Sequence, residues 1–231
     1  MKKLVVLSGA GISAESGILT FRDTGGLWEN HSIEDVATPE GWRKNPQLVL
    51  DFYNQRRKQS ATVEPNAGHL ILAELEKYFD VHIITQNVDN LHERAGSSNI
   101  LHLHGELSKV RSSIDDNYII DIGDKSIQLG DLAPDGSQLR PHIVWFGEMV
   151  PMIEPAAELC MEADIFVVVG TSMQVYPAAG LIQYVPMDSP KFVVDPNKPE
   201  IGNSYKKLTF IQENATTGVA KLRDLLLKEH L

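Results

Sequence analysis

The N-terminal stretch of residues 4–23 constrains the fold more than any other part of the sequence. It opens with four consecutive apolar residues, 4–7, which is typical of a strand buried on both faces of a parallel sheet. A turn containing Gly9 and Gly11 follows directly, and then a segment that can begin a helix. Glycines permit unusual φ angles, and the backbone N–H groups of such a turn can point at an anion near the helix N-terminus. The stretch therefore predicts either a phosphate-binding turn or an ordinary βα turn that requires glycine.

This turn departs in two ways from the fingerprint of dehydrogenases that bind dinucleotides. The fingerprint has a third glycine three residues after the second one, and this chain has Ala14 there. It also has an acidic residue about 20 residues further on, at the end of a second strand. Residues 20–28 of this chain instead form a polar loop that contains glycines. We therefore expect a dinucleotide site whose cofactor is not used for hydride transfer.

Charge and cysteine content exclude several classes of protein. The net charge of −10 over 231 residues argues against a nucleic-acid-binding protein, which needs a basic face, and suits cationic, lysine-rich partners. The single cysteine, Cys160, excludes an internal disulfide and any metal site built from several cysteines. The apolar run at the N-terminus is too short for a signal peptide, and no run is long enough to span a membrane. We expect a cytoplasmic protein with no membrane partner.

The order of expected elements predicts an α/β fold with a Rossmann-like parallel sheet and helices on both of its faces. Apolar runs predict strands at residues 81–84, 99–104, 142–146, 165–169, 191–194 and 208–211. Two stretches interrupt this alternation: residues 29–77, with helices capped by Asn45 and Asn66, and the turn-rich residues 108–141, with brief strand-like runs at 118–122 and 126–129. We therefore assign residues 1–28, 78–107 and 142–231 to the large domain, and the two interruptions to a smaller one.

Polar or small residues follow four of the predicted strands, at residues 8–11, 86–89, 104–105 and 170–172. Because the carboxyl ends of parallel strands meet at one edge of a sheet, we expect these clusters to line one site. Asn87 and Asp89 offer an amide and a carboxylate for a carboxamide ligand, although turn chemistry explains either residue alone. His104 shares a face with His102 and is a candidate general base, but a single histidine is more often structural.

Two further pairs of side chains could either belong to a binding site or have an ordinary structural role. Tyr53 and Arg56 lie one helical turn apart, so a phenol and a guanidinium on one face could bind a carboxylate, whereas most such arginines are only solvated. Arg22 and Asp23 lie on the loop that could close over a cofactor, or they form an exposed ion pair.

Together these motifs resemble the sirtuins, a family of NAD-dependent protein-lysine deacylases, over nearly the whole chain. The matching segments are residues 9–13 (GAGIS), 20–23 (TFRD), 85–92 (TQNVDNLH), 104–107 (HGEL), 140–148 (RPHIVWFGE) and 170–172 (GTS). The resemblance implies that NAD is consumed as a co-substrate and that an acyl-lysine protein or peptide is the partner. The products would be free lysine, nicotinamide and O-acyl-ADP-ribose.

The resemblance also implies roles for individual residues. The acyl carbonyl oxygen would attack C1′ of the ribose, with His104 as general base on a ribose hydroxyl, Asn87 catalytic and Phe21 shielding the reactive carbon. The other expected NAD-binding residues are Gly9, Ala10, Gly11, Ser13, Arg22, Asp23, Trp28, Gln86, Asp89, Gly170, Thr171, Ser172 and Ala215, with either Asp195 or Asn197 at the adenosine ribose. A substrate peptide would pair as a strand between residues 146–148 (Phe146, Gly147, Glu148) and the segment of Val175.

Two features bear on the subclass and on metal content. Tyr53 and Arg56 match the Y-x-x-R pair of class III sirtuins, which remove succinyl and malonyl groups, and Ala37 matches a small residue that leaves room for a longer acyl chain. The family usually has a four-cysteine zinc site in the second insert, where this chain has Ser112 and no cysteine. We expect desuccinylase, demalonylase and deacetylase activity, NAD as cofactor and no zinc. The alternatives are an NAD glycohydrolase or ADP-ribosyltransferase, and a non-catalytic sensor of NAD or ADP-ribose.

Overall fold

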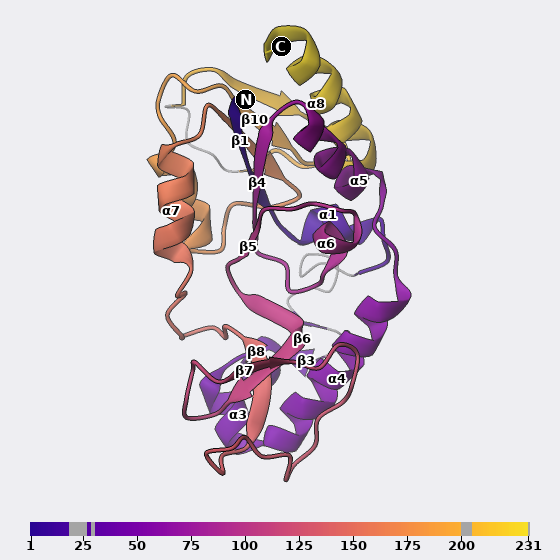
Figure 1. Cartoon of the computed structure of the whole chain (residues 1–231), viewed down its shortest axis with the longest axis vertical. Helices are drawn as coiled ribbons and strands as arrows, with labels where there is room; N and C mark the ends of the chain where they lie inside the picture. The colour runs from indigo at the N-terminus through magenta and orange to yellow at the C-terminus, as the bar shows by residue number, and fades with distance from the viewer. Residues whose placement is uncertain (19–26, 29–30, 200–204, 231) are drawn as a thin grey trace.

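The computed structural model describes residues 1–18, 27–28, 31–199 and 205–230, which form a large and a small lobe (Figure 1). The strands are β1 (Lys3–Ser8), β2 (Leu27–Trp28), β3 (His31–Ser32), β4 (Asp80–Thr85), β5 (Ile100–His102), β6 (Gly105–Ser112), β7 (Ile119–Asp121), β8 (Leu139–Ile143), β9 (Ile165–Val169), β10 (Lys191–Val194) and β11 (Leu208–Ile211). The helices are α1 (Ala10–Ala14), α2 (Ile33–Val36), α3 (Pro39–Lys44), α4 (Pro46–Thr62), α5 (Ala67–Glu74), α6 (Leu91–Arg94), α7 (Ile153–Met161) and α8 (Ala215–His230), with 3₁₀ segments η1 (Leu75–Lys77) and η2 (Ala178–Tyr184).

The large lobe is built on a six-stranded sheet with the order β11-β10-β9-β1-β4-β5. All neighbouring strands in it are parallel, and β1 lies between β4 and β9. The chain builds the sheet outward from β1 on one side, through β4 and β5, and then crosses to build the other side from β9. The turns after β1 and β9 therefore meet where the strand order reverses, the place where open α/β sheets bind ligands. The predicted fold class is confirmed.

Helices cover both faces of this sheet because its central strands are apolar on both sides. Leu4 and Val6 of β1 face a core shared with α5 and α8. Val5 and Leu7 face the opposite core, shared with α7 and η2. Figure 1 shows α7 on one side of the sheet and α5 and α8 on the other. This double burial explains why the unbroken apolar run at 165–169 has the bounds of β9. The strands predicted at 191–194 and 208–211 have the bounds of β10 and β11, and β11 is an edge strand with Leu208 and Thr209 exposed.

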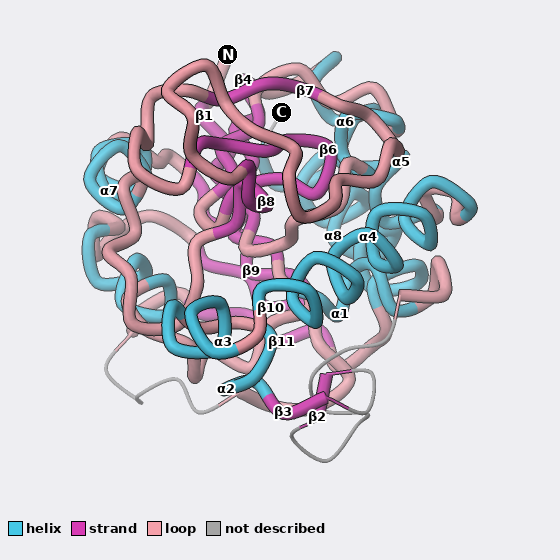
Figure 2. Tube along the Cα trace, turned by 90° about the horizontal axis from the view of Figure 1, so that it is seen from below, coloured by secondary structure: helices cyan, strands magenta, loops and turns pink. Residues whose placement is uncertain are grey.

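The small lobe holds an antiparallel sheet with the order β7-β6-β8 and the helices α2–α4. Seen from this end of the molecule (Figure 2), α3 and α4 lie in front of the large sheet. Asn45 caps α4 by accepting a hydrogen bond from the Leu48 N–H at 3.1 Å, and Pro46 occupies the first helical position, as predicted. Leu50 of α4 packs against Val110 and Leu139 and so joins the helix to the small sheet.

Two sequence predictions in this lobe are wrong. Residues 142–146 do not return to the large sheet, because β8 pairs antiparallel with β6, with Ile143 opposite Gly105. A short apolar run does not reveal which sheet it joins, and β6 begins directly after His104. The small sheet therefore includes residues 105–107 and 142–143, which we had assigned to the large domain. Residues 126–129 form no strand, because the Asn54 side chain donates to the Ile127 carbonyl and accepts from the Ile127 N–H.

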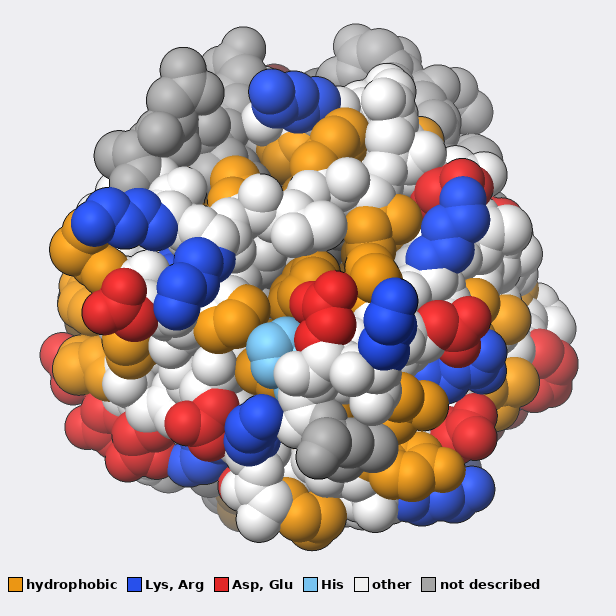
Figure 3. Space-filling view, turned by 90° about the horizontal axis from the view of Figure 1, so that it is seen from above, with side chains coloured by type: hydrophobic (Ala, Val, Ile, Leu, Met, Phe, Trp, Pro, Cys, Tyr) orange, Lys and Arg blue, Asp and Glu red, His pale blue; other side chains and the backbone are white. Residues whose placement is uncertain are grey.

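The surface carries charges of both signs. On the large-lobe end shown in Figure 3, acidic and basic side chains are interspersed, so the net charge of −10 is not concentrated on this face. Among the described helices, none is both long and apolar enough to cross a membrane.

Candidate active site

A cavity of about 720 Å³ opens at the carboxyl ends of the large-sheet strands and extends toward the small lobe. All four predicted polar clusters reach it, together with residues that follow β10 and begin α8. The predicted site residues that line it are Gly9, Ala10, Gly11, Ser13, Ala37, Tyr53, Gln86, Asn87, Asp89, His104, Phe146, Gly147, Glu148, Gly170, Thr171, Ser172, Val175, Asp195, Asn197 and Ala215. Phe21, Arg22, Asp23 and the side chain of Trp28 lie outside the part of the chain that the structure describes.

The two glycine turns at the strand-order reversal pack directly against each other. A Cβ on Gly9 would lie 2.7 Å from the Thr171 Cβ, and a Cβ on Gly11 would lie 2.7 Å from the Gly170 Cα. The Gly9 N–H donates to the Val169 carbonyl at 3.0 Å, and the Gly11 N–H donates to the Gly170 carbonyl at 2.8 Å. The left-handed φ angle belongs to Gly170, at +63°, and not to the first turn. The Gly9 and Gly11 N–H groups are thus bonded within the chain, and close packing of the two turns requires these glycines, as the ordinary βα turn predicts.

Ser13 is the centre of the polar floor of the cavity. Its hydroxyl accepts a hydrogen bond from the Asn87 amide at 3.0 Å and donates one to an Asp89 oxygen at 3.1 Å. The other Asp89 oxygen accepts from the Leu91 N–H at 3.1 Å. Burial raises the pKa of the Asp89 carboxyl, and the hydrogen bonds from Leu91 and Ser13 oppose that shift. Asn87 and Asp89 are both 7 % exposed, so this floor holds an amide and a carboxylate in fixed directions.

His104 is held as a neutral imidazole between the end of β5 and the start of β6. Its Nδ1 lies 3.0 Å from the Gln86 carbonyl oxygen, which can only accept, so Nδ1 carries the proton. Burial lowers the pKa of the imidazole, although the bond to the Gln86 carbonyl opposes this. The neutral ring therefore presents an unprotonated Nε2, which is the form that a general base requires.

The residues after β10 and at the start of α8 form the far end of the cavity. Asp195 is 2 % exposed and accepts a hydrogen bond from the Asn197 N–H at 2.8 Å, while Asn197 is exposed. Ala215 is 4 % exposed and begins α8. Both candidates for the adenosine ribose, Asp195 and Asn197, thus line the cavity.

The structure brings only one member of the Tyr53–Arg56 pair to the cavity wall. The Tyr53 hydroxyl accepts a hydrogen bond from the Trp145 indole N–H at 3.2 Å, and burial raises the pKa of its phenol, so it stays neutral. The Arg56 guanidinium lies 5.8 Å from the centroid of the Phe52 ring, and Arg56 is not among the described residues that line the cavity.

The segment expected to pair with a peptide already uses two of its N–H groups inside the chain. The Phe146 N–H donates to the Ala37 carbonyl at 2.9 Å, and the Glu148 N–H donates to the Trp145 carbonyl at 3.0 Å. Gly147 between them has a φ of +90°, which favours glycine. The segment is therefore a turn, and a peptide would have to pair through its remaining groups.

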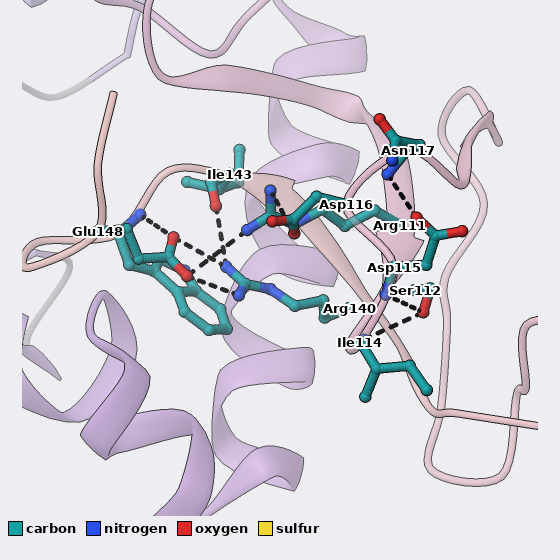
Figure 4. Close-up of polar contacts among 10 residues, drawn as sticks. Arg111, Ser112, Ile114, Asp115, Asp116, Asn117, Arg140, Ile143 and Glu148 are labelled. Atoms are coloured by element: carbon teal, nitrogen blue, oxygen red, sulfur yellow. Dashed lines mark hydrogen bonds and ion pairs between the residues drawn. The ribbon is translucent and has the colours of Figure 1, made fainter. Parts of the chain in front are cut away.

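A charge cluster behind this turn was not predicted. Glu148 bonds to Arg140 at 2.8 Å, lies 3.5 Å from Arg111 and accepts from the Trp145 N–H at 2.8 Å (Figure 4). The Arg140 guanidinium stacks on the Trp145 ring at 3.3 Å from its centroid. Burial alone would raise the pKa of Glu148, but the hydrogen bonds from Arg140 and the Trp145 N–H and the charges of the two arginines lower it. The only sequence signal for the cluster was the dense run of polar and aromatic residues at 140–148.

The residues around Ser112 do not fit a zinc ion. Its hydroxyl donates to Asp135 at 2.6 Å and contacts the Ser137 hydroxyl at 2.8 Å. It also accepts from the N–H groups of Ile114 and Asp115 (Figure 4). The single cysteine of the sequence lies in α7, in the core of the large lobe. Hydrogen bonds to one serine thus join the two loops of the small sheet.

Comparisons with known proteins agree with this geometry. The model of the Sir2 family matches residues 9–177. A protein of Bacteroides thetaiotaomicron named NAD-dependent protein deacylase is 56 % identical over 232 residues, covering 98 % of this chain and 99 % of its own. A Helicobacter pylori (strain J99) protein of the same name is 56 % identical over 228 residues, covering 99 % of this chain and 95 % of its own.

Solved structures show the same relationship. The structure of a Sir2 homologue in complex with NAD superposes with a TM-score of 0.87 at 37 % identity, covering 98 % of this chain and 90 % of its own. The fold, the cavity at the strand-order reversal and these similarities lead to one conclusion: the chain belongs to the Sir2 family.

Proposed function

We propose that this protein is an NAD-dependent protein-lysine deacylase that removes succinyl, malonyl and acetyl groups. One observation carries the proposal: a single cavity holds a neutral histidine with an unprotonated Nε2, an amide–serine–carboxylate floor and the Tyr53 phenol. The names of the Bacteroides and Helicobacter relatives support the reaction class.

NAD fits the cavity as a consumed co-substrate, and when bound it would supply a ribose carbon with a nicotinamide leaving group. Asn87 and Asp89 would bind the nicotinamide and ribose end, because their directions are fixed by Ser13. Asp195, Asn197 and Ala215 would bind the adenosine end. His104 Nε2 would accept a proton from a ribose hydroxyl, since its pKa is lowered and its Nδ1 proton is committed to Gln86.

The acyl chain would enter between the two lobes, past Ala37 and toward Tyr53. The Trp145 N–H donates to the Tyr53 oxygen and so orients the phenol, whose hydroxyl would donate to a carboxylate at the end of the acyl chain. Arg56 lies on the next turn of the same helix and would add charge-assisted hydrogen bonds after turning from its place beside Phe52. Acetyl groups do not reach this end of the pocket and would depend on neither residue.

Mass spectrometry of succinyl-, malonyl- and acetyl-lysine peptides, each with and without NAD, tests the proposal. We expect loss of the acyl group only when NAD is present, with nicotinamide as a product. Consumption of NAD at the same rate without any peptide would instead indicate a glycohydrolase. Binding of NAD or ADP-ribose without consumption would indicate a sensor.

A further inference from the structure

The four successive carbonyl groups of residues 85–88 each accept a hydrogen bond from the segment that contains His102 and His104. The Leu103 N–H donates to Thr85 at 2.9 Å, and the Leu107 N–H donates to Val88 at 2.8 Å. Between them, His104 Nδ1 bonds to the Gln86 carbonyl at 3.0 Å, and His102 Nδ1 bonds to the Asn87 carbonyl at 3.1 Å. The two imidazoles thus donate hydrogen bonds to the two middle carbonyl groups, and backbone N–H groups donate to the first and the last.

The two histidines differ at their second nitrogen. His104 lines the cavity, whereas His102 Nε2 lies 2.7 Å from a Glu93 oxygen. The His102 side chain is 9 % exposed and that of Glu93 is 39 % exposed. Since the Asn87 carbonyl and the Glu93 carboxylate are both acceptors, both nitrogens of His102 carry protons, and the ring is an imidazolium paired with Glu93.

The groups around His102 support this charged state. Burial alone would lower the pKa of His102, but the hydrogen bond and charge of Glu93, and then the charge of Glu106, raise it instead. The pKa of Glu93 is correspondingly lowered by His102, against the effect of burial. The charge of His102 lowers the pKa of Asp89, whose carboxylate forms part of the cavity floor, and the charge of Glu93 opposes this effect.

We propose that His102 is a positioning residue: held by Glu93, it fixes the Asn87 peptide and thereby the directions in which Asn87 and Asp89 meet the nicotinamide end of NAD. The inference rests on the proposed function for the identity of the ligand. His102 touches no reacting atom and acts through Asn87, which joins it to Ser13 and the cavity floor.

A double-mutant cycle on NAD affinity tests this inference without any acyl substrate. The cycle compares wild type, His102→Phe, Asn87→Ala and the double variant, with dissociation constants measured by titration with NAD. We expect His102→Phe alone to weaken NAD binding about tenfold or more, as loss of a charge-assisted hydrogen bond does. In the Asn87→Ala background the same change should cost about twofold or less, because the two residues act as one unit.

Two further variants separate positioning from general stability. His102→Asn keeps a donor on the side chain and should recover part of the affinity that His102→Phe loses. His82→Phe is the matched control, because His82 pairs with Asp80 at 3.1 Å on β4 and does not line the cavity. Its affinity for NAD should stay within about twofold of wild type, since distant sites act independently.

The outcomes are distinct. Additive losses in the cycle, or equal losses for His102→Asn, His102→Phe and His82→Phe, would overturn the inference. If wild type binds NAD and the cycle shows coupling, but no acyl peptide is deacylated, the proposed function fails while the positioning role of His102 stands.

Discussion

The floor of the cavity and the small sheet both bury polar groups, but they stabilise these groups with different interactions. The floor uses neutral donors and acceptors around a single carboxylate, with Ser13 between Asn87 and Asp89. The small sheet uses full charges, with Glu148 shared by Arg111 and Arg140. A floor with one carboxylate held by hydrogen bonds leaves space for a ligand that carries its own charge. In the small sheet, Glu148 is already paired with two arginines, so removing it would be costly and few of its acceptor sites remain for a ligand.

The largest expected effect is on catalysis, at His104. His104→Ala should lower deacylation about 10²–10⁴-fold, because a positioned general base is lost. The free energy of unfolding should fall by about 1–3 kcal/mol relative to the control variant His82→Ala, because the Gln86 carbonyl loses its donor, which is a smaller cost than that expected for Glu148→Gln. Both are measured on the same preparations, by peptide deacylation and by urea unfolding. If His104→Ala lost as much stability as Glu148→Gln, the cavity residues and the small-sheet residues would not differ in their role in folding.

The small sheet should show the opposite pattern. Glu148→Gln leaves two mostly buried guanidiniums, Arg111 and Arg140, without their shared carboxylate, and should cost about 3–5 kcal/mol in the free energy of unfolding. Glu162→Gln is the control, since its pair with Lys3 is exposed and should cost less than about 1 kcal/mol. Equal costs in urea unfolding would show that the cluster is no more than a surface ion pair.

Acidification probes the same carboxylate. The pKa of Glu148 is lowered in the folded protein, so its contribution to stability is present above the ordinary value of 4.5 and is lost as pH falls through the lowered value. The difference in unfolding free energy between wild type and Glu148→Gln should therefore shrink below about pH 4.5. A difference that is constant from pH 7 to strongly acidic solution would argue against ionisation as its cause.

Substitution in the acyl pocket should separate substrates. Arg56→Met should reduce turnover of a succinyl peptide by about 1.5–3 kcal/mol in transition-state binding, because a charge-assisted hydrogen bond to the acyl carboxylate is lost. Turnover of an acetyl peptide should be largely spared. Equal losses on both peptides, measured as kcat/KM, would assign Arg56 to the structure of α4.

A smaller effect is expected where the family usually binds zinc. Ser112→Ala removes an acceptor for two N–H groups and a donor to Asp135, and should cost about 1–3 kcal/mol of stability. Ser98→Ala, which removes an exposed hydroxyl bonded to Glu76, is the matched control. If zinc analysis of the purified protein finds one ion per chain, the serine-centred description of these loops is wrong.

The smallest effect is on the pH profile of the reaction. Because the pKa of His104 is lowered from 6.5, its neutral form persists to lower pH, and the acid limb of kcat/KM should lie below about pH 6.5. A limb above that value would mean that another group limits the rate.

Sequence reasoning succeeded where local pattern determines structure. Strands such as β9 and β10 are buried on both faces, so the first and last residues of these strands could be predicted from the sequence. The convergence of the polar clusters followed from the parallel sheet. The predictions that failed depended on partners distant in sequence: β8 pairs with β6, and the Asn54 side chain bonds to the Ile127 backbone in place of a neighbouring strand. His102 is two residues before His104 in the sequence, but only the structure reveals the hydrogen bond between His102 Nε2 and Glu93.

The most direct test of the account is the ratio of nicotinamide released to lysine deacylated, measured in one reaction with a succinyl-lysine peptide and NAD. We expect one nicotinamide for each lysine freed by the wild type, and only a trace of free lysine from His104→Ala. Release of nicotinamide in excess of free lysine, at a rate that does not depend on the peptide, would contradict it.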